Sequence, residues 1–207
     1  MGIKDYSDLN EIQLDVLKEI GNIGAGSAAT SLADMLMTTI DISVPEVRIL
    51  DYEEATERLG GPETMVVGLM ISLVGDFQGM IMFLLEKEFA HLPLSNLMGQ
   101  EMNSFSEIDE VGMSAFREVA NIMAASYVNA ISSMTGMRIE LTVPDLCIDM
   151  LGSILSVPAI HYANISDKII LIEGEFKGET ANSRNHVLLL PDAESLEKIM
   201  SALGIEL

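Results

Sequence analysis

The sequence predicts an α+β fold built by internal duplication, with one antiparallel sheet of about six strands, two long motif helices and shorter helices packed on it. Two observations predict this class. A long amphipathic segment with the pattern of residues 15–26 returns 99 residues later at 114–125. Each copy is followed by strand-like runs and ends in a helix. We therefore expect one domain over 1–207, made of two repeats at about 7–100 and 106–207 and related by pseudo-two-fold symmetry.

Composition and charge narrow the class of protein. The 207 residues are 49% hydrophobic and 21% charged, which supplies a sizeable core and disfavours global disorder. The chain has 32 acidic and 11 basic residues, a formal net charge of −21. This excess disfavours binding to nucleic-acid backbones and anionic membranes. It favours solubility or a salty cytoplasm, and it leaves open a partner with a basic face.

Cys147 is the single cysteine, so no internal disulfide can form and a reducing compartment is expected. Its position in an apolar run predicts a small core residue rather than a nucleophile. The polar N-terminus lacks a signal-peptide pattern, and the apolar run at 65–75 is too short to span a bilayer. We expect a cytoplasmic monomer with no membrane partner.

The first repeat opens with a helix that we expect Ser7 or Asp8 to cap and that runs to about Met37. With Ile12 as the angular reference, a helical period separates two sides of this segment. The predicted core stripe is Val16, Leu17, Ile20 and Ile23. The predicted polar ridge is Asp15, Glu19, Asn22 and Gly26.

Three glycines inside this helix cost about 1 kcal/mol each relative to alanine, so each needs a reason. Close packing against another helix accounts for Gly21 and Gly24. Gly26 lies on the polar ridge, where we expect clearance for a partner instead.

The pattern of the rest of the first repeat predicts strands and one helix. Residues 40–50 alternate, and Pro45 inside them indicates an edge, a bend or a bulge. A turn at 60–62 is followed by a hairpin of 65–74 with 78–85. The segment 86–98 predicts a helix that contains Pro93 and ends at Gly99.

The second repeat follows the same plan. Ser106 and Asp109 predict the start of a helix that runs to about Thr135 and closes at Gly136. With Val111 as the reference, the core stripe is Ala115, Val119 and Ile122. The polar ridge is Ser114, Glu118, Asn121 and Ala125.

The last part of the chain completes the sheet. Residues 138–143 predict a strand that ends at Pro144, and the apolar segment 145–157 favours a helix over a strand. Strands are expected at 168–176 and 186–190, with a loop at 182–185 between them. Asp192 is expected to cap a final helix that Gly204 ends.

The repeat preserves two polar residues that a fold does not require. Glu19 and Asn22 recur as Glu118 and Asn121 at the same offset, while their neighbours differ between the copies. An isolated Glu-x-x-Asn on a helix is usually solvated surface. Two such pairs at matching places in diverged halves favour a functional reading.

A carboxylate and an amide limit the chemistry available. No Cys, His or Lys accompanies them, so a nucleophile paired with a base is missing. The three histidines are scattered, so no metal centre is predicted, and nothing marks a sugar cleft. An amide can position an attacking water, as a glutamine does in GTPases. A carboxylate one turn away could pair with a lysine of a partner protein.

The pattern Asp/Ser-x3-Glu-x2-Asn-x22-Pro occurs twice, ending at Pro45 and Pro144. It resembles the consensus of the CheC/CheX/FliY family of chemotaxis phosphatases, and two intact motifs resemble its CheC branch. The resemblance implies hydrolysis of the aspartyl phosphate of CheY, the chemotaxis response regulator. Glu19 and Glu118 would then engage the regulator's lysine, and Asn22 and Asn121 would position water. The Mg²⁺ would belong to the regulator, and no cofactor of the chain's own is expected.

The resemblance also implies partner-binding residues and leaves alternatives open. Asp15 and Ser114 occupy a position where the family allows both types, and Ala125 in place of Gly26 predicts that the two sites differ. The resemblance further implies binding of CheD, a receptor deamidase, through a helix around Asp149. The chain could therefore be a non-enzymatic CheD adaptor, or bind the regulator without turnover.

Overall fold

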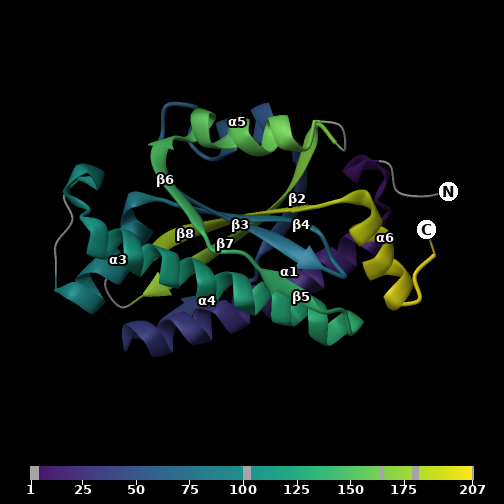
Figure 1. Cartoon of the computed structure of the whole chain (residues 1–207), viewed down its shortest axis with the longest axis horizontal. Helices are drawn as coiled ribbons and strands as arrows, with labels where there is room; N and C mark the ends of the chain where they lie inside the picture. The colour runs from purple at the N-terminus through teal and green to yellow at the C-terminus, as the bar shows by residue number, and fades with distance from the viewer. Residues whose placement is uncertain (1–4, 100–103, 164–165, 179–181, 207) are drawn as a thin grey trace.

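The computed structural model describes residues 5–99, 104–163, 166–178 and 182–206. Figure 1 shows three layers, with α5 on one face of a central sheet and the long helices α1 and α4 on the other. The helices are α1 (Glu11–Leu36), α2 (Tyr52–Arg58), α3 (Lys87–Met98), α4 (Glu110–Thr135), α5 (Leu151–His161) and α6 (Ala193–Ala202). Short 3-10 turns at Tyr6–Asp8 and Phe105–Glu107 precede the two long helices.

The described residues form one sheet whose paired strands are all antiparallel, in the order β1/β2, β7, β8, β4, β3, β5/β6. The strands are β1 (Ile40–Ile42), β2 (Glu46–Asp51), β3 (Met65–Gly75), β4 (Gly79–Leu85), β5 (Ile139–Leu141), β6 (Asp145–Met150), β7 (Lys168–Gly178) and β8 (Asn182–Pro191). β1 and β2 together make one broken edge strand, and β5 and β6 make the other. Counted this way, the sheet has the six positions expected from the sequence, and the α+β class is confirmed.

The two halves of the chain interlock through their edge strands. β2 from the first half pairs with β7 from the second, and β6 from the second half pairs with β3 from the first. The buried prolines Pro45 and Pro144 interrupt the two edges, where a residue without an N–H is tolerated. Each half thus completes the sheet of the other.

Helix ends follow local chemistry, with two corrections to the predicted caps. The side chain of Asn10, not Ser7 or Asp8, caps α1 by accepting from the Gln13 N–H, and Gln13 returns the bond. Asp109 alone caps α4, by accepting from the Gly112 N–H at 2.8 Å. The 3-10 turns explain the shift, because each ends before the α-helix begins.

Two apolar cores lie on opposite faces of the sheet. The larger core packs α1, α3, α4 and α6 against it, and the smaller one packs α2 and α5. Of the predicted stripes, Val16, Leu17, Ile20 and Val119 are buried. Ile23 and the two reference residues are exposed, and Ala115 and Ile122 are half-buried. The buried face is therefore rotated away from the polar ridge.

Close packing against another helix is confirmed for Gly24, whereas Gly21 packs against the sheet and not against a helix as expected. A Cβ at Gly24 would lie 2.5 Å from the Tyr127 ring of α4, and one at Gly21 would lie 3.3 Å from Ile172 and Val47 of the sheet. A Cβ at Gly26 meets no atom within 4 Å. Gly24 is needed for helix-on-helix contact, whereas Gly21 lets α1 approach the sheet.

Three predictions of local structure were wrong. Residues 145–150 form strand β6 and only 151–161 form a helix, because β6 pairs with β3 from Asp145 opposite Met70 to Met150 opposite Met65. Residues 182–185 continue β8 against β7 and do not form a loop. The sequence reading also missed α2, which Asp51 caps. Pairing with distant strands overrode the local pattern in the first two cases.

Candidate functional site

The first polar ridge lies on the exposed side of α1. Asp15, Glu19 and Asn22 are all exposed, and Gly26 is half-buried. The Asp15 carboxylate pairs with Lys18 at 2.7 Å, so that lysine is directed along the helix surface rather than toward the Glu-Asn pair. Within the described part of the chain, neither Glu19 nor Asn22 has a side-chain hydrogen bond or ion pair. Both groups are thus available to a partner.

The second ridge repeats this arrangement on α4 with less exposure. Ser114 and Glu118 are exposed, whereas Asn121 and Ala125 are half-buried. The Ser114 hydroxyl donates to the Glu110 carbonyl at 3.0 Å, so it offers no carboxylate equivalent to Asp15. The two ridges therefore differ in charge at their first position and in the accessibility of the amide.

The two broken edges lie beside the long helices. Val47 of β2, two residues after Pro45, faces α1. Its Cγ2 would lie 3.3 Å from a Cβ built at Gly21. Gly21 directly precedes Asn22. The link between β1 and β2 is thereby held near the amide, which gives the Pro45 spacing of the motif a structural meaning.

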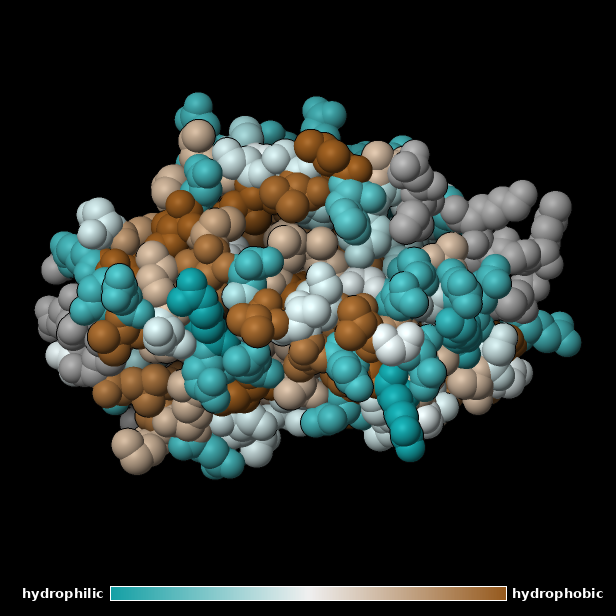
Figure 2. All heavy atoms as spheres, in the orientation of Figure 1, coloured by the Kyte–Doolittle hydropathy of each residue, from teal (hydrophilic) through white to brown (hydrophobic). Residues whose placement is uncertain are grey.

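Asp149 does not lie on a helix, which corrects the prediction for this residue. It is exposed in β6, opposite Val66 of β3, and its carboxylate accepts from the Met150 N–H at 2.7 Å. The following helix α5 carries no Asp, Glu, Lys or Arg, and it exposes Val157 and Ile160. Figure 2 shows hydrophobic residues gathered over α5 and the strands beneath it.

Cys147 is exposed rather than part of the core. It alternates with the inward-facing Leu146 and Ile148 along β6, and so points away from the larger core. Although the residue is exposed overall, partial burial of its sulfur against β3 and the nearby Asp149 raise the pKa of Cys147. A thiol with a raised pKa is a weak nucleophile at neutral pH.

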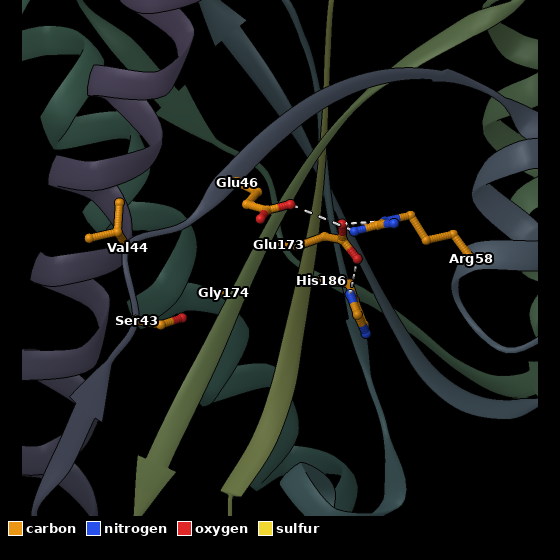
Figure 3. Close-up of a pocket in the computed structure, with 7 residues that line it drawn as sticks. All are labelled: Ser43, Val44, Glu46, Arg58, Glu173, Gly174 and His186. Carbon is orange, nitrogen blue, oxygen red and sulfur yellow. Dashed lines mark hydrogen bonds and ion pairs between the residues drawn. The ribbon is translucent and has the colours of Figure 1, made fainter.

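A charged cleft not predicted from the sequence lies at the link between β1 and β2, with its charged groups on the face of the sheet that packs α2 and α5 (Figure 3). Glu173 of β7 accepts from Arg58 of α2 and lies 3.6 Å from the Arg48 Nε. The buried His186 has its Nε2 3.0 Å from Glu86 and its Nδ1 3.7 Å from Glu173. The cleft is about 550 Å³ and reaches Ser43 and Val44 at the edge link.

The second half has no such cluster at the matching positions. Glu173 pairs with Glu46 in the first half. The residue equivalent to Glu46 in the second half is Asp145, which pairs with Met70, so Met70 stands where Glu173 does. His186 opposite Glu173 corresponds likewise to Met82 opposite Met70. Among the described residues, this face of the sheet thus differs between the two halves, with a charged cluster in one and methionines at the matching positions of the other.

Comparison with known proteins relates this chain, with its interlocked halves and its repeated Glu-Asn ridge, to the CheC-like family. The model of the CheC-like family matches residues 12–49 and again residues 111–148, each containing one ridge and one broken edge. The resemblance drawn from the sequence is confirmed.

Individual relatives agree with this class. The chain is 29% identical to the CheY-P phosphatase CheC of Bacillus subtilis (strain 168) over 206 residues, covering 98% of this chain and 99% of that protein. It is 27% identical to the flagellar motor switch phosphatase FliY of the same organism over 144 residues, covering 69% of this chain and 37% of FliY. The crystal structure of Thermotoga maritima FliY superposes with a TM-score of 0.72 at 25% identity, covering 95% of this chain and 98% of that one.

Two features are absent from the described residues. No helix there combines the length and apolarity needed to cross a membrane. No group of three or more His, Cys, Asp and Glu side chains in the same residues could hold a metal ion.

Proposed function

We propose that this chain is a chemotaxis phosphatase that hydrolyses the aspartyl phosphate of a CheY-type response regulator. The similarity to the CheY-P phosphatase CheC over nearly the whole chain supports this activity. The observation that carries the residue assignment is the pair of exposed Glu-Asn ridges on α1 and α4, in which neither Glu19 nor Asn22 is engaged within the described chain.

In this proposal each ridge completes the active site of the regulator. The Asn22 or Asn121 amide enters the site and orients a water in line with the phosphorus, so that the water attacks and the aspartate leaves. The Glu19 or Glu118 carboxylate pairs with the regulator's lysine and sets the depth of insertion. Asp15, Ser114 and Gly26 lie along the same contact. The magnesium ion that neutralises the phosphate is the regulator's own.

Phosphate release from a phosphorylated CheY-type regulator tests this assignment. Asn22→Ala and Asn121→Ala should each reduce turnover, and the double variant should lose about 100-fold or more, because an unpositioned water forfeits the gain from orientation. Asn129→Ala is the matched control, since Asn129 is an exposed asparagine of α4 outside the ridge. Undiminished hydrolysis by the double variant would show that these amides do not position the water.

The carboxylates have a test of their own. Glu19→Lys in an Asn121→Ala background should raise KM strongly, because it sets a positive charge against the regulator's lysine. Glu19→Gln should have the same direction and a smaller effect. A pair of variants with unchanged KM would remove the proposed role in docking.

A second candidate function is an adaptor that binds a CheD-type deamidase. Helix α5, which lacks Asp, Glu, Lys and Arg and exposes Val157 and Ile160, follows the strand that carries the acidic Asp149, and this apolar surface favours an adaptor role on a chain whose net charge is −21. Capture of CheD should be lost in Asp149→Lys and kept in Asp145→Lys, an exposed aspartate at the other end of β6. Capture that ignores the charge at Asp149 would place the contact elsewhere.

A further inference from the structure

Four large aliphatic side chains are exposed at matching places in the two repeats. Ile12 and Val111 are 64% and 60% exposed, and Val44 and Val143 are each 81% exposed. Both pairs are separated by 99 residues, the offset that relates the two Glu-Asn ridges. The exposed Met37 and Ile160 are not repeated in this way, since their counterparts at the same offset are the glycines Gly136 and Gly61, and the exposed Ile23 recurs only as the half-buried Ile122.

These residues border the ridges. Ile12 lies seven residues before Glu19, two turns along the same side of α1. Val44 lies in the link between β1 and β2, three residues before Val47, which packs against α1 at Gly21. Three residues of chain span at most about 10 Å, so Val44 lies close to the turn of α1 that carries Asn22. Figure 3 shows Val44 next to the α1 ribbon.

Packing inside the chain does not require either side chain. The stripe that α1 buries is rotated away from Ile12, and Pro45, not Val44, is the residue of the link that is buried. A single exposed aliphatic residue is ordinary on a protein surface. The recurrence of two of them around both ridges, in halves whose other surfaces have diverged, indicates a shared contact.

We propose that Ile12 with Val44, and Val111 with Val143, are the apolar contacts that seat the receiver domain of the phosphorylated regulator over each ridge. This inference rests on the proposed function and adds to it the residues that determine affinity. Protein interfaces gain most of their affinity from a few desolvated apolar contacts, while polar groups fix orientation. Here the aliphatic residues hold the receiver, and the Glu and Asn act on its phosphorylated site.

The experiment isolates one ridge at a time. In an Asn121→Ala background only the first ridge can turn over, and Ile12→Ser with Val44→Ser removes its apolar border. The double substitution should raise KM for the phosphorylated receiver about tenfold and leave kcat within about twofold. Ile160→Ser in the same background is the matched control, because Ile160 is 77% exposed on α5, across the sheet from α1. The mirrored set uses Asn22→Ala with Val111→Ser and Val143→Ser.

A binding measurement separates this inference from the proposed function. The receiver is activated with beryllium trifluoride in place of phosphate, and its affinity is measured by calorimetry. Weaker binding of the aliphatic variants, with the control unchanged, supports the inference even if no phosphate is released by the parent protein. Unchanged KM and affinity in both double variants would overturn it, while loss of turnover in the Asn variants would leave the phosphatase assignment intact.

Discussion

The ring of Tyr127 in α4 lies against the backbone of Gly24 in α1, so closely that a Cβ at Gly24 would stand 2.5 Å from the ring. Tyr127 is buried, and its ring also lies 6.2 Å from that of Phe83 in the sheet. An offset of 99 residues relates the two repeats. The residue equivalent to Gly24 is then Met123, and the residue equivalent to Tyr127 is Ala28. Large and small residues are exchanged between the repeats, so the contact that fixes the two motif helices is asymmetric.

Gly24→Ala is expected to destabilise the protein. Alanine gains about 1 kcal/mol in helix propensity, but forcing a methyl into a filled contact costs about 1–3 kcal/mol. The net free energy of unfolding should fall by about 1 kcal/mol, as measured by urea denaturation. The cost should shrink in a Tyr127→Leu background, because the clashing ring is gone. A Gly24→Ala protein as stable as the parent in both backgrounds would contradict this account of the contact.

Gly26→Ala should have the opposite effect on stability. Its added methyl meets open space, so the gain in helix propensity of up to about 1 kcal/mol remains. If Gly26 gives clearance to the regulator, the more stable variant will nevertheless turn over more slowly in the Asn121→Ala background. The reverse substitution, Ala125→Gly, serves as the comparison at the second ridge. Full activity of the Gly26→Ala variant would remove the clearance role.

Tyr52→Phe is expected to stabilise the protein by about 1 kcal/mol. The Tyr52 hydroxyl oxygen is buried and finds no hydrogen-bond partner among the described residues. Removing an unsatisfied buried polar group relieves its desolvation cost. Tyr6→Phe is the matched control and should lose about 1 kcal/mol, because the Tyr6 hydroxyl donates to the Pro191 carbonyl. Thermal unfolding of the two variants should show shifts of opposite sign.

Alkaline pH should unfold the protein through its tyrosines. Burial raises the pKa of all four, that of Tyr52 to about 12. The protonated tyrosines stabilise the fold fully below pH 10, which is about the pKa of tyrosine in the unfolded chain. This stabilisation is lost as pH rises toward the higher pKa values of the folded state. Absorbance at 295 nm should therefore report tyrosinate together with the loss of helix signal above pH 10. Ionisation of all four tyrosines in a protein that keeps its helices would contradict the buried positions.

Helices and motif spacing could be predicted because both depend on residues near in sequence. The ends of α4 and α6, at Gly136 and after Asp192, follow from capping groups within one turn. The Glu-Asn ridges could be placed on helix surfaces because a 3.6-residue period needs no tertiary information. The charged cleft could not be predicted, since strand register brings Glu173 opposite His186 and the packing of α2 on the sheet brings Arg58 to them.

By itself, the sequence indicated the duplication, an edge, a bend or a bulge at Pro45, and the Glu-Asn ridges that we propose a partner meets. The tertiary structure decided which side of each long helix is buried, and so left Ile23 outside the core that the helical period predicted. It also decided that residues 145–150 are a strand. These residues pair with the backbone N–H and C=O groups along the edge of β3, which would stay unpaired if 145–150 were a helix. The physical reason is the same in both cases: burial and strand pairing are supplied by segments distant in sequence, and they outweigh local preference where the two disagree.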